Sequence, residues 1–238
     1  MSKNIPNKDC RTLGIVLRRT NYGEADRILS LITPFGKISA MAKGVRKAKS
    51  KLAGGVEMFS LVDLNIHQGR GKLGMVTGAK MVEYYGTGIL ANFERMELAA
   101  TILKKIDRVT EEVEDLGQVE NASAEDFFEI TRQSLRALND GVGARLVSSW
   151  FGINFLRASG EEMNLYRDIN GEKLRADLKY NWNVIEGAFE RAESGEFGAD
   201  EIKLLRLMTT LELKKVKLIK VDGEMLTKIY GIIRRDKN

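Results

Sequence analysis

Apolar residues in the first third of the chain come in short runs that alternate with polar residues or are rich in β-branched side chains. Turn-forming segments such as Asn21–Glu24, Pro34–Gly36 and Gly69–Gly71 separate these runs. Period-two patterns bounded by glycine and proline predict β-strands. We therefore expect five strands, at Arg11–Thr20, Asp26–Thr33, Lys37–Ala42, Glu57–His67 and about 72–82.

From about Asn92 onward, apolar residues recur at spacings of three or four, which is the period of an amphipathic helix. Ser123, followed three residues later by Asp126, has the spacing of a helix N-cap pair. The segment 143–158 is apolar on nearly all sides, which predicts a central core helix. Further helices are expected near Trp182–Ala192, Ala199–Leu213 and Gly223–Arg234, with irregular polar structure and at most a short hairpin at 160–180.

These patterns together predict an α+β protein. Five short strands within roughly 70 residues are typical of a small closed barrel, and the oligonucleotide-binding (OB) fold is the commonest choice at this length. We therefore expect a five-stranded OB-fold β-barrel at residues 1–82, followed by an all-helical C-terminal domain at residues 83–238.

Composition excludes several classes of protein. The 238 residues are 43% hydrophobic and 30% charged, as in a globular protein. No apolar run approaches the roughly 18–20 residues of a membrane span, and the first residues lack the apolar core of a signal peptide. Cys10 is the only cysteine, which excludes an intrachain disulfide and a multi-cysteine metal cluster. We expect no membrane partner and a cytoplasmic protein.

Charge is distributed unevenly along the chain. The net charge is +5, but residues 1–80 carry 15 lysines and arginines against 5 acidic residues. Residues 81–238 carry 23 against 28, so the two parts have opposite sign. This asymmetry predicts an N-terminal module that binds a polyanion.

The most basic stretch follows the third expected strand. Five of the nine residues from Lys43 to Lys51 are basic and none is acidic: Lys43, Arg46, Lys47, Lys49 and Lys51. Cations on a loop that leaves a sheet can neutralise phosphates, and Gly44, Gly54 and Gly55 would let this loop approach a nucleic-acid backbone closely. Other cations would extend the footprint if they project to the same face, and are otherwise solvated surface charges: Arg18, Arg19, Arg27, Arg70 and Lys72.

Few aromatic side chains are available to stack on bases. Residues 1–80 contain only Tyr22, Phe35 and Phe59, and we expect Phe59 in the barrel core. Tyr22 and Phe35 lie beside turns, where they could be exposed. Backbone electrostatics should therefore dominate nucleic-acid binding, with weak sequence preference.

Three other kinds of functional site fit the sequence less well than a nucleic-acid surface does. Gly69–Gly74 fits G-x-G-x-x-G but lies between two strands, so a hairpin turn is expected in place of a dinucleotide site. His67 with Asp63 could act as a general base, but no partnered nucleophile is evident. Glu24 and Asp26, or Asp63, could bind metal in a nuclease. Glu24 and Asp26, however, lie two residues apart in a turn, which is typical of side chains that form hydrogen bonds and ion pairs within the turn itself.

An ordered series of short motifs runs from Tyr22 to Phe59: Tyr22-Gly23-Glu24, Asp26, Thr33, Gly36-Lys37, Ala42-Lys43-Gly44-Val45-Arg46, Ser50, Glu57 and Phe59. This series resembles the N-terminal pattern of the RecO family of bacterial recombination mediators. A looser match continues through Trp150–Gly160 and through a pattern from Leu207 to Leu226. The resemblance implies an OB fold, a helical domain and no catalytic centre. It also implies binding of single- and double-stranded DNA, strand annealing, and a location at the nucleoid.

The same resemblance implies partners and, in many members, a zinc ion. The partners are RecR and the tail of single-stranded DNA-binding protein, so that RecA can load. The family's four-cysteine zinc site would fall at about Gly160–Lys179, which contains no cysteine and no histidine. We therefore expect no zinc and no other cofactor.

A receptor for an acidic peptide tail needs an apolar slot with a cation at its rim. Arg145 is our candidate in the helical domain, with Arg132 and Arg206 as alternatives, and each could equally be a helix-surface charge. An OB-fold accessory protein that binds RNA or the ribosome is the alternative function.

Overall fold

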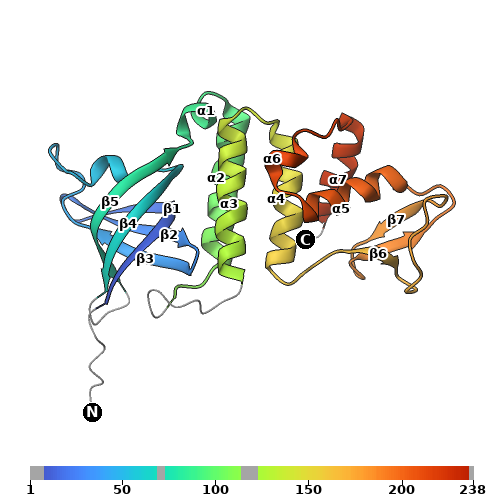
Figure 1. Ribbon diagram of the computed structural model, residues 1–238, viewed down its shortest axis with the longest axis horizontal. Coiled ribbons are helices and arrows are strands. Elements are labelled where there is room, and N and C mark those ends of the chain that lie inside the picture. Colours follow the sequence, from blue (N-terminus) through green and yellow to red (C-terminus); the bar gives the residue numbers. More distant parts are fainter. Residues whose placement is uncertain (1–7, 69–72, 114–122, 236–238) are drawn as a thin grey trace, which may run out of the picture. The chain divides into compact units, whose positions relative to one another are not determined.

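A computed structural model describes residues 8–68, 73–113 and 123–235 of the chain. The Cα positions form two compact units, residues 1–141 and 142–238. Each unit is described by itself below (Figure 1).

The first unit contains the expected barrel. Its strands close in the order β1-β2-β3-β5-β4, and all neighbours are antiparallel except the parallel pair β3 and β5. The α+β class and the five-stranded barrel are thus confirmed, with strand limits close to those predicted. The strands are β1 (Lys8–Tyr22), β2 (Asp26–Thr33), β3 (Gly36–Ala42), β4 (Ser60–Gln68) and β5 (Gly74–Tyr84).

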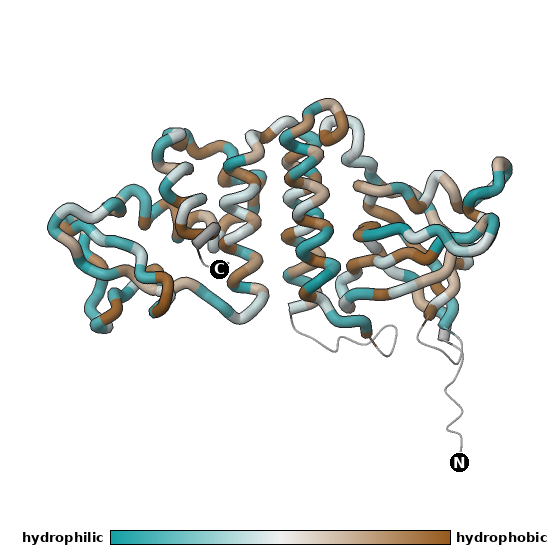
Figure 2. The backbone as a smooth tube through the Cα atoms, turned by 180° about the vertical axis from the view of Figure 1, so that it is seen from behind, coloured by the Kyte–Doolittle hydropathy of each residue, from teal (hydrophilic) through white to brown (hydrophobic). Residues whose placement is uncertain are grey.

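Alternation of side chains produces the barrel core. Along β3, buried positions alternate strictly with half-buried ones, so every second side chain points inward. Figure 2 shows hydrophobic and hydrophilic stretches alternating along these strands. Phe59 is only 9% exposed, as expected for a core residue. The fully packed cluster includes Val16, Leu29, Leu31, Ile38, Val62 and Leu64.

Three helices belong to the same unit as the barrel: α1 (Gly86–Leu90), α2 (Phe93–Val109) and α3 (Ser123–Asn139). The side chain of Asn92 caps α2 by accepting a hydrogen bond from the Arg95 N–H at 3.0 Å. Helix α1 was not predicted. The barrel ends near the expected limit at residue 82, but α2 and α3 pack on β1, β2 and β3, so the first compact unit continues to residue 141.

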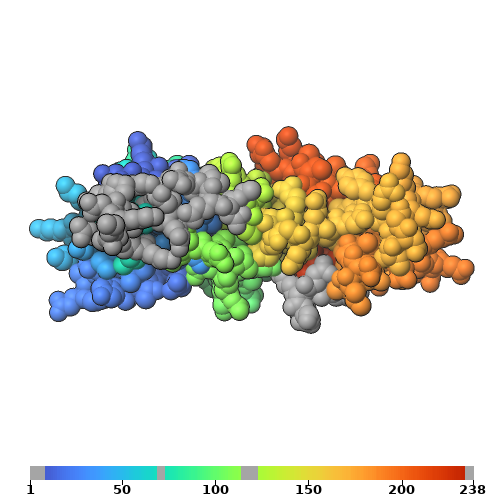
Figure 3. Space-filling view, turned by 90° about the horizontal axis from the view of Figure 1, so that it is seen from below, coloured from blue at the N-terminus to red at the C-terminus, as the bar shows by residue number. Residues whose placement is uncertain are grey.

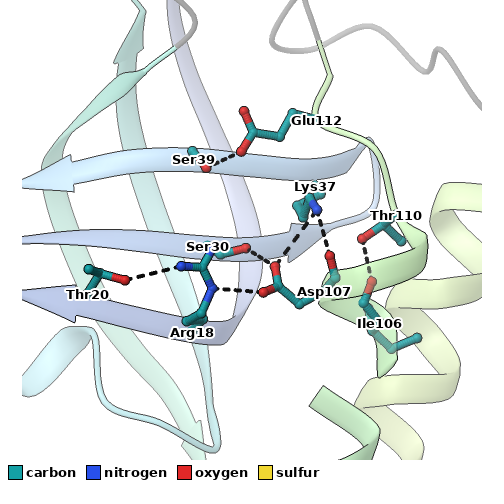
Figure 4. Close-up of polar contacts among 9 residues, drawn as sticks. All are labelled: Arg18, Thr20, Ser30, Lys37, Ser39, Ile106, Asp107, Thr110 and Glu112. Carbon is teal, nitrogen blue, oxygen red and sulfur yellow. Dashed lines mark hydrogen bonds and ion pairs between the residues drawn. The ribbon is translucent and has the colours of Figure 1, made fainter. Parts of the chain in front are cut away.

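One carboxylate fixes α2 to the barrel wall (Figure 4). Asp107 accepts a hydrogen bond from Ser30 Oγ at 2.6 Å and one from Arg18 Nε at 2.9 Å, while its backbone carbonyl accepts from Lys37 Nζ at 2.7 Å. Burial acts to raise the pKa of Asp107, but the hydrogen bonds from Ser30 and Arg18 and the nearby positive charges outweigh it and leave this pKa below its ordinary value.

The second unit combines a group of helices packed on α4 (Ala144–Ala158) with a small sheet that contacts α5. Helix α4 is buried on nearly all sides, as predicted. Trp150 Nε1 donates to the Leu211 carbonyl at 3.0 Å, and Asn154 Nδ2 donates to the Met208 carbonyl at 2.9 Å. The other helices are α5 (Ala199–Thr210), α6 (Leu213–Val216) and α7 (Gly223–Arg235).

The helix predicted at Trp182–Ala192 is wrong, and the second unit is therefore not all-helical. Strands β6 (Asn164–Asp168), β7 (Tyr180–Asn183) and β8 (Ala188–Arg191) form a sheet in the order β6-β8-β7. Asn183 Oδ1 accepts hydrogen bonds from the Ile185 and Glu186 N–H groups at 3.1 Å, which turns the chain between β7 and β8. Gly187 takes a φ of +57° in this turn. Local turn chemistry thus overrides the helical spacing of the apolar residues.

Replacing Asp107 with Asn should destabilise the first unit by about 1.5–3 kcal/mol at pH 7, because charge-assisted hydrogen bonds are lost. A lowered pKa in the folded state contributes stability that is present above the unfolded pKa of about 3.9 and is lost as pH falls through the folded value. The difference between wild type and variant should therefore narrow below about pH 4. Urea unfolding at several pH values measures this difference in the free energy of unfolding. Glu97→Gln on the exposed face of α2 is the control, and equal stability of the two variants would contradict the assignment.

Candidate nucleic-acid interface

The basic loop 43–51 leaves β3 at the end of the barrel where β1 turns into β2. The opposite end of β2 and β3, at Thr33–Gly36, faces α3, since a side-chain atom on Gly36 would lie 4.0 Å from Ala124. The loop therefore lies away from the helices of its own unit (Figure 1). Atoms in the light blue of residues near 50 project from the barrel unit in Figure 3.

Hydrogen bonds fix the start of the loop to the β1–β2 turn. The Gly44 N–H donates to Asp26 Oδ1 at 2.7 Å, and the Arg46 N–H donates to the Ala25 carbonyl at 2.9 Å. The Arg46 guanidinium also reaches the Gly23 carbonyl at 3.3 Å. Gly44 has a φ of +63°, a conformation that side chains other than glycine adopt with strain. The β1–β2 turn and the start of the loop are thus joined by one contact, which the motif residues Gly23, Asp26, Gly44 and Arg46 form.

A buried valine anchors the loop from within. Val45 is 2% exposed and belongs to the barrel core, although cations stand close to it in the sequence. The Lys47 N–H donates to the Gly44 carbonyl at 3.1 Å, and the Ser50 N–H donates to the Lys47 carbonyl at 3.0 Å. With its backbone held inward, the loop exposes all five cationic side chains to solvent: Lys43, Arg46, Lys47, Lys49 and Lys51.

The other predicted cations are not gathered on this loop. Arg18 binds Asp107, and Arg19 Nη1 donates to Glu57 Oε2 at 2.6 Å. Arg27 Nε donates to Asn21 Oδ1 at 3.2 Å. Arg18 and Arg19 are therefore engaged in ion pairs within the protein. Arg70 and Lys72 lie outside the described residues.

Two of the carboxylates considered for a nuclease, Asp26 and Asp63, are engaged in other contacts. Asp26 accepts from the loop, and Asp63 accepts two hydrogen bonds from Arg11, at 3.0 Å and 2.6 Å, which lower its pKa. His67 Nδ1 lies 2.7 Å from Asp9 Oδ1 and is not paired with Asp63. Among the described residues, no three His, Cys, Asp or Glu side chains group as metal ligands.

The arginines proposed for partner binding each contact their own unit. On α4, Arg145 Nη1 donates to Thr227 Oγ1 at 3.0 Å. Arg206 donates twice to the Leu165 carbonyl, at 2.9 Å and 2.7 Å, and lies 4.7 Å from the centre of the Tyr166 ring. Arg132 belongs to the first unit, where it pairs with Glu129 at 2.7 Å. The three residues thus do not lie together in one unit.

The stretch that would carry a zinc site is ordered by hydrogen bonds. Asp168 is 7% exposed, and its Oδ1 accepts from the Asn170 and Glu172 N–H groups, both at 2.9 Å. Phe189 packs nearby against three aromatic rings, with centroids 5.0–6.2 Å away, from Tyr180, Trp182 and Phe197. The only cysteine and the only histidine of the chain lie on barrel strands, so the residues of this stretch do not fit a zinc ion.

No helix among the described residues is both long enough and apolar enough to span a membrane.

Replacing Asp26 with Ala should loosen the loop, because the Gly44 N–H loses a charged acceptor. Loss of a hydrogen bond worth about 1.5 kcal/mol raises local opening about tenfold. Trypsin cuts after lysine and arginine, so the rate of cleavage within 43–51 reports this opening. Glu24→Ala, which removes the neighbouring exposed carboxylate, should leave the rate unchanged. Equal rates for the two variants would show that Asp26 does not hold the loop.

Comparison with known proteins agrees with the motif pattern across both units. The family model for the N-terminal domain of recombination protein O matches residues 8–85, and the model for its C-terminal domain matches residues 108–235.

Individual relatives cover most or part of the chain. A DNA repair protein RecO from Dehalococcoides mccartyi is 28% identical over 233 residues, which span 95% of this chain and 88% of the relative. The RecO of Roseiflexus sp. is 34% identical over 156 residues, or 66% of this chain and 52% of the relative. The RecO of Bifidobacterium longum is 43% identical over 100 residues, which span 42% of this chain and 41% of the relative. With both family models matched in order, the chain belongs to the RecO family of DNA repair proteins.

Proposed function

We propose that this protein is a non-catalytic recombination mediator that binds single- and double-stranded DNA and anneals complementary strands. One observation carries the proposal: five exposed cations stand on a loop whose backbone is fixed to the end of an OB barrel. Such barrels commonly bind oligonucleotides. Membership of a DNA repair family supports DNA as the polyanion.

The loop supplies affinity without reading sequence. Each lysine or arginine that contacts a phosphate releases a counterion, so five contacts to a single strand give a salt slope of roughly −3.5, at about 0.7 per contact. A cationic surface also lowers the repulsion between two strands that approach each other. Annealing therefore needs no catalytic side chain and no metal ion, and we propose that the protein works without zinc.

The proposed partners follow from the family. RecR and the tail of single-stranded DNA-binding protein would bring the mediator to coated DNA, where RecA loads. Arg145 remains our candidate for the carboxylate of that tail, with Arg132 and Arg206 as alternatives. A cytoplasmic, nucleoid-associated location is part of the same proposal.

Replacing Lys43, Arg46, Lys47, Lys49 and Lys51 with Ala should reduce affinity for single-stranded DNA at least tenfold at low salt and flatten the salt dependence, because phosphate contacts disappear. Fluorescence anisotropy across a salt series measures both. The control removes five other exposed cations, Lys104, Lys173, Lys203, Lys214 and Lys215, and carries the same charge change. An equal loss in both variants would assign the effect to net charge and contradict the role of the loop.

Competition with RNA tests the choice of nucleic acid. A strand of RNA equal in length to the DNA should compete no better than the DNA does, and a strong preference for RNA would favour an RNA- or ribosome-binding protein.

Immobilised protein should capture both RecR and single-stranded DNA-binding protein. Single-stranded DNA-binding protein that lacks its acidic tail should not be retained, because the expected receptor recognises that tail. Nuclease treatment before the capture removes bridging DNA. Failure to retain either partner would contradict the mediator proposal while leaving DNA binding intact.

A further inference from the structure

Helix α2 covers part of the barrel surface that OB folds use for oligonucleotides, which is the outer face of the second and third strands with the adjoining loops. Ser30 on β2 and Lys37 on β3 are bound by Asp107 of α2. Ser39 on β3 donates to Glu112, which follows α2 (Figure 4). These hydroxyl and ammonium groups could otherwise contact phosphates, but oxygen atoms of Asp107 and Glu112 already accept their hydrogen bonds.

The uncovered part of this face lies beside the basic loop. Tyr22 pairs with Asp26 across β1 and β2, and paired residues of antiparallel strands project from the same face. Asp26 in turn binds the Gly44 N–H, and Arg46 reaches the Gly23 carbonyl, one residue after Tyr22. The Tyr22 side chain therefore stands at the open end of the face, next to the cations.

Tyr22 is also free to receive a ligand. It is 53% exposed, and no hydrogen bond or ring contact of its side chain occurs among the described residues. The other two aromatic residues in the first 80 are not available here. Phe59 is buried in the core, and Phe35 lines a cavity of about 510 Å³ with Val113 and Phe127 at the far end of β2.

We infer that Tyr22 is a stacking platform for an unpaired base of a DNA strand whose phosphates are held by loop 43–51. The inference deepens the proposed DNA-binding function and rests on it. Because α2 covers part of the face, the DNA strand would follow the uncovered end at the β1–β2 turn. An aromatic ring there adds binding energy for single strands alone, since bases in a duplex are already stacked.

The test compares Tyr22→Ala and Tyr22→Leu with Tyr22→Phe. The Ala and Leu variants lack a ring and should bind single-stranded DNA between about 5- and 150-fold more weakly, the range observed for loss of one stacked base. Tyr22→Phe keeps the ring and should bind like the wild type. Affinity for duplex DNA and the slope of the salt dependence should stay unchanged, because the phosphate contacts remain.

Phe93→Ala is the matched control. Phe93 is an aromatic residue of the same unit, 74% exposed, at the start of α2, and its removal should leave DNA binding unaltered. Wild-type affinity of both ring-less variants, together with weakened binding by the five-cation variant, would overturn the stacking role and leave the proposed function standing. Absence of DNA binding by the wild-type protein would overturn both. Preferential loss of duplex binding in the Ala and Leu variants would also overturn the stacking role.

Discussion

The contact of the Asp107 carboxylate with the barrel sets the architecture of the first unit. One side chain and its own carbonyl hold groups from β1, β2 and β3, so a single helical turn is tied to three strands. Charge-assisted hydrogen bonds of this kind contribute about 1.5–3 kcal/mol each, a large share of a marginal total stability. The same contact lies on the outer face of β2 and β3, so the helix that it holds covers part of that face.

At the other end of β2, the basic loop is ordered before any ligand arrives. Its backbone is fixed by Asp26 and by the buried side chain of Val45, while its cations point outward. A loop that is already ordered loses less conformational entropy on binding than a mobile one, so more of the electrostatic gain remains as affinity. The motif that first indicated the family thus has a structural origin: Asp26 and Gly44 shape the loop, and the cations beside them face the solvent.

Local patterns were sufficient to predict the barrel and most helices, because alternation and turn residues act over a few positions. They failed at Trp182–Ala192, where Trp182, Ile185 and Phe189 have helical spacing. The structure buries Trp182 and Phe189 in an aromatic cluster but leaves Ile185 93% exposed at the tip of a turn. Pairing of β8 with β6 brings together segments more than 20 residues apart, which periodicity within one segment does not report.

The site shows the same division between local and long-range information. The cationic run was evident in the sequence because it is continuous. The pairing of Arg18 with Asp107 joins residues 89 positions apart, so it could not be predicted from the sequence around either residue. The burial of Val45 could have been predicted from the sequence, because a branched apolar side chain is more often buried than the cations close to it in the sequence.

The turn at Asp168 is held by a carboxylate and backbone N–H groups, where the family resemblance had implied thiolates and a zinc ion. A carboxylate that accepts backbone N–H groups is not a target for the oxidants that convert cysteine thiolates to sulfenic acid or disulfides. The two hydrogen bonds that order this turn therefore involve neither a metal ion nor a thiol. These hydrogen bonds should therefore persist under oxidising conditions that would modify a thiol.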